Sequence, residues 1–66
     1  MNLIVNGEAR LLPPGTSVQM LMAELGLAGK RAAVERNGEI VPRSLYAQTT
    51  LAEGDRIEIV QAIGGG

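Results

Sequence analysis

The sequence contains no cysteine and no histidine, and its only aromatic residue is Tyr46. Without cysteine the chain forms no disulfide and offers no thiol nucleophile. Without histidine it lacks both an imidazole base and the commonest zinc ligand. A single aromatic side chain gives no stacking platform for single-stranded nucleic acid. Any reaction that involves this chain therefore takes most of its catalytic groups from a partner.

An excess of charge of either sign is also missing. Six basic and seven acidic residues give a net charge of −1 and are scattered without blocks, which argues against a nucleic-acid or anionic-membrane surface. The first residues carry neither a charged leader nor a long apolar core. We therefore expect no signal peptide, no membrane span and a cytoplasmic location. A chain of 66 residues forms one small domain, which buries only about 60% of the surface exposed by its unfolded form.

A first β-hairpin is predicted around Asn6-Gly7, because this dipeptide readily adopts the positive φ angles of a type I′ turn. The turn joins an apolar run at 3–5 to a return strand at 8–12. Side chains alternate along a strand, so Met1, Leu3 and Val5 share one face. We expect Leu12 of the return strand to point inward.

A second hairpin is predicted around Asn37-Gly38, between strands at 31–36 and 39–41. Pro42 ends the return strand and favours an edge position, because proline cannot donate a ladder hydrogen bond. Residues 43–50 have no clear period and are expected to wrap around the sheet edge, with Leu45 and Tyr46 tucked inward. A tight turn at 53–55 then leads into the last strand, where Ile57 and Ile59 face the core.

The segment between the hairpins predicts one amphipathic helix. Thr16 is the expected N-cap, with Gln19 reaching back in the capping-box pattern, and Gly26 suits the left-handed position after the last turn. Met20 falls on the outer side, as an isolated surface residue or as a partner contact. The inward stripe has the spacing of one buried helix face and consists of Val18, Leu21, Met22 and Leu25.

A helix with one apolar stripe needs one sheet face to cover it, so we predict an α+β domain. The economical form is a mixed sheet of about four to five strands with the helix packed across one face. In such a sheet the last strand can lie in the middle, parallel to the first. This arrangement is the β-grasp, or ubiquitin-like, fold. We assign it to residues 1–63, with a flexible glycine tail at 64–66.

The tail itself consists of Gly64, Gly65 and Gly66. Glycines have no side chains to pack, and extended they would carry a terminal carboxylate roughly 10 Å beyond Ile63. Taken alone, three glycines are compatible with a disordered end or a truncation scar. Together with the predicted fold, they indicate a carboxylate presented to another protein's active site.

The chain resembles the ThiS family of sulfur carriers in thiamin thiazole biosynthesis. The most specific match is Asn37-Gly38-Glu39-Ile40-Val41-Pro42-Arg43 followed by an aromatic, here Tyr46. Further matches are Val5-Asn6-Gly7-Glu8, Pro14-Gly15-Thr16, the segment from Glu53 to Val60, and the terminal glycines.

The resemblance implies that this chain is a protein co-substrate and not an enzyme. A ThiF-like enzyme would use ATP and Mg to adenylate the Gly66 carboxylate. Sulfur from a cysteine desulfurase pathway would then form a thiocarboxylate, and thiazole synthase (ThiG) would accept that sulfur. No intrinsic cofactor or metal is expected. The alternatives are a MoaD-like or other thiocarboxylate carrier, a ubiquitin-like protein modifier, and a plain β-grasp interaction domain.

A carrier of this kind also needs a docking surface. Val60 and Ile4 are expected on the open face of the sheet, with Ala62 and Ile63 continuing toward the tail, and exposed Arg43 and Arg56 are candidates for electrostatic steering. The alternative reading is that Val60 and Ile4 are ordinary β-formers on an exposed face, and that the two arginines are solvated.

Overall fold

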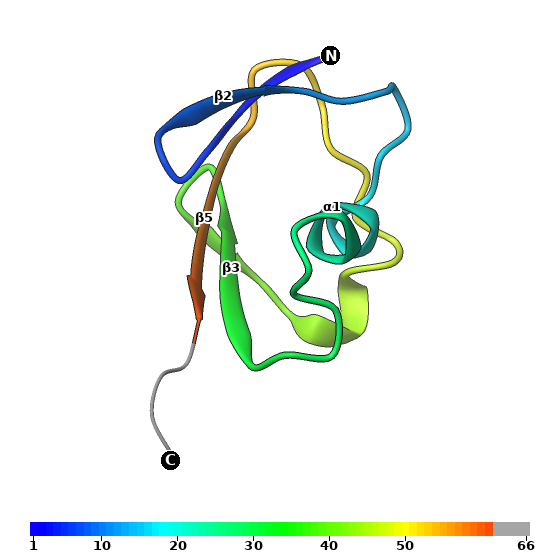
Figure 1. Ribbon diagram of the computed structural model, residues 1–66, viewed down its shortest axis with the longest axis vertical. Coiled ribbons are helices and arrows are strands. Elements are labelled where there is room, and N and C mark those ends of the chain that lie inside the picture. The colour runs from blue at the N-terminus through cyan, green and yellow to red at the C-terminus, as the bar shows by residue number, and fades with distance from the viewer. Residues whose placement is uncertain (62–66) are drawn as a thin grey trace.

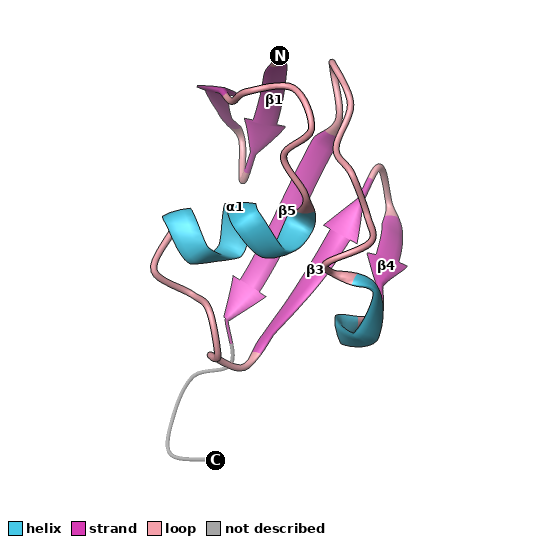
Figure 2. Ribbon diagram, turned by 90° about the vertical axis from the view of Figure 1, so that its right-hand side faces the viewer, coloured by secondary structure: helices cyan, strands magenta, loops and turns pink. Residues whose placement is uncertain are grey.

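A computed structural model gives the fold and describes residues 1–61. In chain order the elements are β1 (Asn2–Val5), β2 (Glu8–Leu11), α1 (Val18–Glu24), β3 (Ala32–Arg36), β4 (Glu39–Val41), a single-turn 3₁₀ helix η1 (Arg43–Leu45) and β5 (Arg56–Gln61). The five strands form one sheet in the order β2-β1-β5-β3-β4. Figures 1 and 2 show α1 and η1 on one side of this sheet, with the other side left open.

The central strand is β5, the last in the chain. It runs parallel to β1, with Val5 opposite Ile57, and antiparallel to β3, with Val34 opposite Ile59. The edge strand β4 is followed directly by Pro42. The prediction of an α+β β-grasp fold with a central, parallel last strand is therefore confirmed.

Both Asn-Gly hairpins are also confirmed. Asn6 and Gly7 have φ angles of 49° and 82°, and Asn37 and Gly38 have 51° and 85°. Positive φ at both central residues defines the type I′ turn, whose twist matches that of paired strands. The turns fix the register of both hairpins, with Val5 opposite Glu8 and Arg36 opposite Glu39.

The helix cap differs from the prediction by one residue. Ser17 is the N-cap; its hydroxyl oxygen accepts from the Met20 N–H at 3.1 Å, and the Met20 sulfur accepts from the Ser17 N–H at 3.5 Å. Thr16 instead closes the preceding turn by donating its hydroxyl to the Pro13 carbonyl at 2.7 Å. The predicted Thr16 and Gln19 cap is thus wrong, because Thr16 is already used by that turn. Gly26 does take the left-handed conformation, with φ 76°.

The core lies between the sheet and α1. Val18, Leu21 and Met22 of the predicted stripe are buried, Leu25 packs partly against them, and Ile57 and Ile59 meet them from β5. Leu3, Val5 and Leu12 are buried as predicted, and Met1 is partly buried against the same cluster.

The irregular segment after β4 follows the prediction only in part. Tyr46 is buried and its hydroxyl donates to the Ala32 carbonyl at 3.4 Å, but Leu45 remains 42% exposed. Leu45 is the last residue of η1 and Tyr46 is its C-cap. Consecutive side chains of a 3₁₀ turn point about 120° apart, so only one of the two points toward the core. Among residues 1–61, no helix has the length and apolar character required to cross a membrane.

Candidate functional site

The predicted reactive group is Gly66, and it lies outside the described residues. So do the tail glycines Gly64 and Gly65, the docking candidates Ala62 and Ile63, and the domain boundary after residue 63. The structure does describe β5 up to Gln61, the strand from which this segment continues. The geometry of β5 is therefore the part of the predicted site that the described residues fix.

The middle of β5 is hydrogen-bonded to the Asn6 side chain, which takes the place of a neighbouring strand. Pairing with β1 ends where the first hairpin turns away. Beyond that point the Asn6 side chain continues the ladder, because its Oδ1 accepts from the Ile59 N–H at 2.7 Å and its Nδ2 donates to the Ile59 carbonyl at 3.3 Å. On the other side, β3 pairs with β5 as far as Gln61, opposite Ala32. The strand is thus bonded on both sides to within two residues of its end.

The start of β5 is held by the turn residue of the second hairpin. The Asn37 Oδ1 accepts from the Arg56 N–H at 2.9 Å, while the Asn37 N–H donates to the Arg56 carbonyl at 2.8 Å. The Asn37 Nδ2 donates to Asp55 Oδ1 at 2.9 Å. Each Asn-Gly turn therefore supplies an asparagine that also binds β5.

Asp55 lies just before β5 and accepts hydrogen bonds from three donors. It is 6% exposed, and besides Asn37 it accepts from Arg36 Nε and from the Ala52 N–H, both at 2.8 Å to Oδ2. Burial by itself raises the pKa of Asp55, but the hydrogen bonds from Asn37, Ala52 and Arg36 outweigh it and lower the pKa below its usual range. Asp55 is therefore a buried carboxylate that ties the second hairpin to the turn before β5.

The open face of the sheet carries both apolar docking candidates, but the structure does not bring them together. Ile4 lies opposite Arg56 and is partly buried, whereas Val60 lies opposite Ala33 and is 69% exposed. Val60 lies four positions beyond Arg56 on β5, a distance of about 13 Å along the strand. Ile4 and Val60 are thus separate apolar positions on one face, and only Val60 is near the end of β5.

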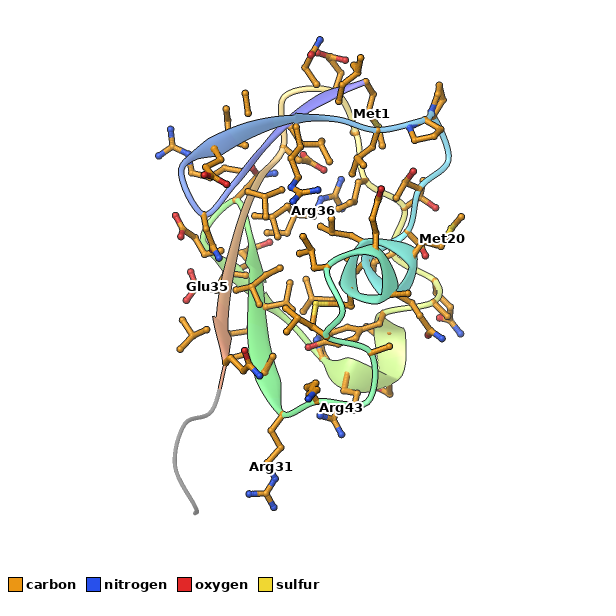
Figure 3. All side chains as sticks on the ribbon, in the orientation of Figure 1. Met1, Met20, Arg31, Glu35, Arg36 and Arg43 are labelled. Carbon is orange, nitrogen blue, oxygen red and sulfur yellow. The ribbon has the colours of Figure 1, made fainter. Side chains whose placement is uncertain are left out.

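Two acidic side chains occupy the middle of the same face. Glu58 of β5 lies directly opposite Glu35 of β3, and Figure 3 shows Glu35 on the side of the sheet away from α1. Like charges directly opposite each other destabilise a strand pair. The face therefore changes along β5 from the neighbourhood of Ile4 and Arg56, through an acidic centre, to Val60.

The sequence model of the ThiS family matches residues 3–66. The chain belongs to the ThiS family. The resemblance based on the Asn37 to Arg43 segment and the terminal glycines is confirmed.

Individual relatives of this ThiS-family chain agree with the assignment. It is 35% identical to sulfur carrier protein ThiS of Escherichia coli K12, over the full length of both chains. A crystal structure of the thiamine biosynthesis protein ThiS from Geobacter metallireducens superposes with a TM-score of 0.84 at 35% identity, also over both full chains. The chain is 50% identical over all 66 residues to part of a thiazole synthase of Paramagnetospirillum magneticum, and it spans only 20% of that protein's length.

Sequence reasoning missed the second role of the two asparagines in this ThiS-family chain. The Asn-Gly signal predicts a turn, and in each turn glycine or aspartate would also tolerate the backbone angles. Asn6 and Ile59 are 53 positions apart in the chain. Only the proximity of β5 in the fold explains why a side-chain amide occupies each turn. Within residues 1–61, no group of three potential ligands among Asp and Glu side chains is arranged to hold a metal ion.

Proposed function

We propose that this chain is the sulfur carrier of a thiamin-type thiazole synthesis, with the sulfur held as a thiocarboxylate on Gly66. A ThiF-like enzyme adenylates the carboxylate with Mg-ATP, a cysteine desulfurase pathway supplies the sulfur, and thiazole synthase (ThiG) accepts it. The observation that carries the proposal is the end-to-end match to the sulfur carrier ThiS of Escherichia coli, in a chain whose last three residues are glycines.

The chemistry explains why a carrier needs an activating partner. A carboxylate is a poor electrophile, so its oxygen first attacks the α-phosphorus of ATP and releases pyrophosphate, which gives an acyl adenylate. A persulfide sulfur then attacks the acyl carbon, and AMP leaves with the electron pair of the broken C–O bond. A thiol reductant cleaves the S–S bond of the resulting acyl disulfide, which leaves the thiocarboxylate on the carrier. Glycine at position 66 suits both steps, because it leaves the acyl carbon unhindered and offers no side-chain nucleophile to capture the activated group.

In this cycle the chain contributes presentation, and its partners contribute catalysis. The nucleotide and Mg belong to the adenylating enzyme, and this chain binds neither by itself. Its own contribution is a rigid β5, held by β3 and Asn6 up to the last residues described. A fixed starting point reduces the conformational freedom that is lost when a tail enters a narrow active site. Since activation consumes ATP, we place the cycle in the cytoplasm.

Thiazole synthase is the favoured acceptor because of two relatives. Thiazole synthases of Paramagnetospirillum magneticum and Magnetococcus marinus each match this chain over all 66 residues, at 50% and 42% identity, and the match covers 20% of each of those proteins. A carrier-like segment inside a synthase chain supports transfer of sulfur between the two kinds of domain.

Intact mass spectrometry tests the proposal. The chain is incubated with ATP, Mg, a sulfur source and the ThiF-like enzyme of the same organism. We expect a gain of about 16 Da, the exchange of one carboxylate oxygen for sulfur, and loss of that gain when thiazole synthase and its substrates are added. Attachment to lysines of other proteins would instead identify a modifier. Transfer to a different sulfur acceptor would identify a carrier of another pathway.

Replacing Val60 with aspartate is expected to weaken partner binding with little effect on stability. Val60 is 69% exposed and has no place in the buried core, so Val60→Asp should raise the Kd for the adenylating enzyme by roughly tenfold or more. Leu11→Asp is a matched control, because Leu11 is 75% exposed on edge strand β2. Titration calorimetry gives the Kd and thermal melting gives the stability. Equal Kd values for the two variants would contradict a docking role for Val60.

A further inference from the structure

Three cationic side chains lie at the end of the molecule where β5 ends. They are Lys30, Arg31 and Arg43, here called the basic collar. Arg31 directly precedes Ala32, which pairs with Gln61, the last described residue of β5. Figure 3 shows Arg31 and Arg43 at this same end. Half of the six basic residues of the chain therefore lie at this end of the molecule, on the β3 and η1 side of Gln61.

The backbone beneath the basic collar is held in place. The Arg43 guanidinium donates to the Lys30 carbonyl at 3.1 Å, and the Tyr46 hydroxyl donates to the Ala32 carbonyl at 3.4 Å. The Lys30 N–H in turn donates to the Leu27 carbonyl at 3.0 Å. The segment that carries Lys30 and Arg31 is thus fastened to η1 and its following residue, and the collar has a defined position relative to β5.

Charge on the collar is not balanced locally. Among residues 1–61 the one ion pair joins Arg36 to Asp55, and Lys30, Arg31 and Arg43 are all exposed. The acidic pair Glu35 and Glu58 lies further along the open face. Although the net charge of the chain is only −1, the surface that residues 1–61 form at the end of β5 carries three positive charges.

The collar also borders an apolar hollow. Arg31 and Arg43 line an open depression of about 440 Å³ together with Ala32, Ala33 and Val60. This depression exists because β4 pairs with β3 only from Val34 to Arg36, so no strand covers this part of the β3 edge. A floor of alanine and valine with two guanidinium groups at its rim suits a protein surface with an apolar centre and carboxylates around it.

We propose that the basic collar docks against an acidic rim around the opening through which the adenylating enzyme receives the tail. This inference rests on the proposed function and adds the chemistry of the partner surface. Opposite charges steer the encounter, and the acidic pair Glu35 and Glu58 repels the same rim, so only one orientation of the carrier is attractive. A protein surface is favoured over a small anion because the three cations are exposed, come from two separate segments and flank an apolar floor.

Association kinetics test the collar. Neither the Lys30 nor the Arg31 side chain makes a hydrogen bond or ion pair within residues 1–61, so Lys30→Glu with Arg31→Glu is expected to leave the fold intact. At low ionic strength, stopped-flow mixing with the ThiF-like enzyme should give an association rate roughly tenfold or more below the wild-type rate. The two rates should converge in about 0.5 M salt, where screening is nearly complete.

A matched control separates local from overall charge. Arg31→Glu and Arg56→Glu change the net charge equally, and both residues are exposed, but Arg56 lies at the opposite end of β5. The collar predicts a slower rate for Arg31→Glu than for Arg56→Glu. Equal rates, or a double variant that associates like wild type, would overturn it. The proposal would also be overturned if the free wild-type chain bound pyrophosphate and the double variant did not. If the wild-type chain never gains the mass of sulfur, the proposed function is wrong. This outcome is distinguishable from failure of the collar, which is measured by association rates.

Discussion

Deletion of Gly66 is expected to abolish thiocarboxylate formation and to leave the domain folded. Without Gly66 the carboxylate sits on Gly65, about 3.5 Å short of its position in the intact chain. A misplacement of only 1 Å can cost roughly 100-fold in rate, so the loss should be at least of that order. Intact mass measured over time after addition of ATP, enzyme and sulfur source gives the rate.

Two controls show whether reach or bulk is responsible. Gly66→Val keeps the length and adds a branched side chain beside the acyl carbon, so it tests crowding alone. Thermal melting of both variants should match wild type, because glycine has no side chain to pack. A large loss of melting temperature in the deletion variant would contradict a role confined to presentation, and an unchanged sulfur mass gain would rule out Gly66 as the site of attachment.

Asp55→Asn is expected to cause a large loss of stability. Asp55 is 6% exposed and accepts from Arg36, Asn37 and the Ala52 N–H. Its replacement leaves Arg36 without its partner and presents an amide donor to groups that also donate. The Arg36 side chain is itself 33% exposed, so the loss is mainly that of the acceptor for the donors around Asp55, roughly 2–3 kcal/mol. For a domain of 66 residues this lowers the melting temperature by roughly 10–20 °C.

The same carboxylate gives a prediction for acid. Its pKa is lower in the folded chain than in the unfolded chain. Its contribution to stability is therefore fully present above the unfolded value of about 4, and is lost as the pH falls through the lowered, folded value. Urea unfolding midpoints at neutral pH and near pH 3 should differ more for wild type than for Asp55→Asn.

Glu53→Gln is the matched control for both measurements. Glu53 stands in the same turn and accepts from the Asn2 N–H at 2.9 Å, but it is exposed. This bond lowers the pKa of Glu53 as well, yet a solvated carboxylate loses little when it is replaced by an amide. If Asp55→Asn were no less stable than Glu53→Gln, the buried network around Asp55 would not be what fastens the second hairpin to β5.

Features set by neighbours in the chain were predictable from the sequence. The Asn-Gly pairs specify both hairpins, the stripe from Val18 to Leu25 specifies the buried helix face, and Pro42 marks the edge strand. Each of these signals depends on backbone angles or on periodicity within a few residues. The two-layer architecture followed from economy, since one amphipathic helix requires one sheet face to cover it, whereas the central place of β5 was one arrangement that such a sheet allows.

Features set by distant contacts were not predictable in the same way. Thr16 and Ser17 are both good N-caps, and only the bond from Thr16 to Pro13 decides between them. The separation of Ile4 from Val60 depends on the register of β1 against β5, which no local pattern specifies. The Asn6 and Asn37 side-chain amides bond to β5, and the Asn-Gly pattern that predicts a hairpin carries no information about that strand.

The strand order has a consequence for how the chain is made. The two hairpins, β1 with β2 and β3 with β4, form from local contacts, but they join into one sheet only through β5. Local hairpins form quickly, whereas pairing between distant segments waits for the whole span between them. During synthesis the sheet therefore stays divided until residues 56–61 have emerged. A chain interrupted before that point has no completed core, so unfinished chains are left open to proteolysis.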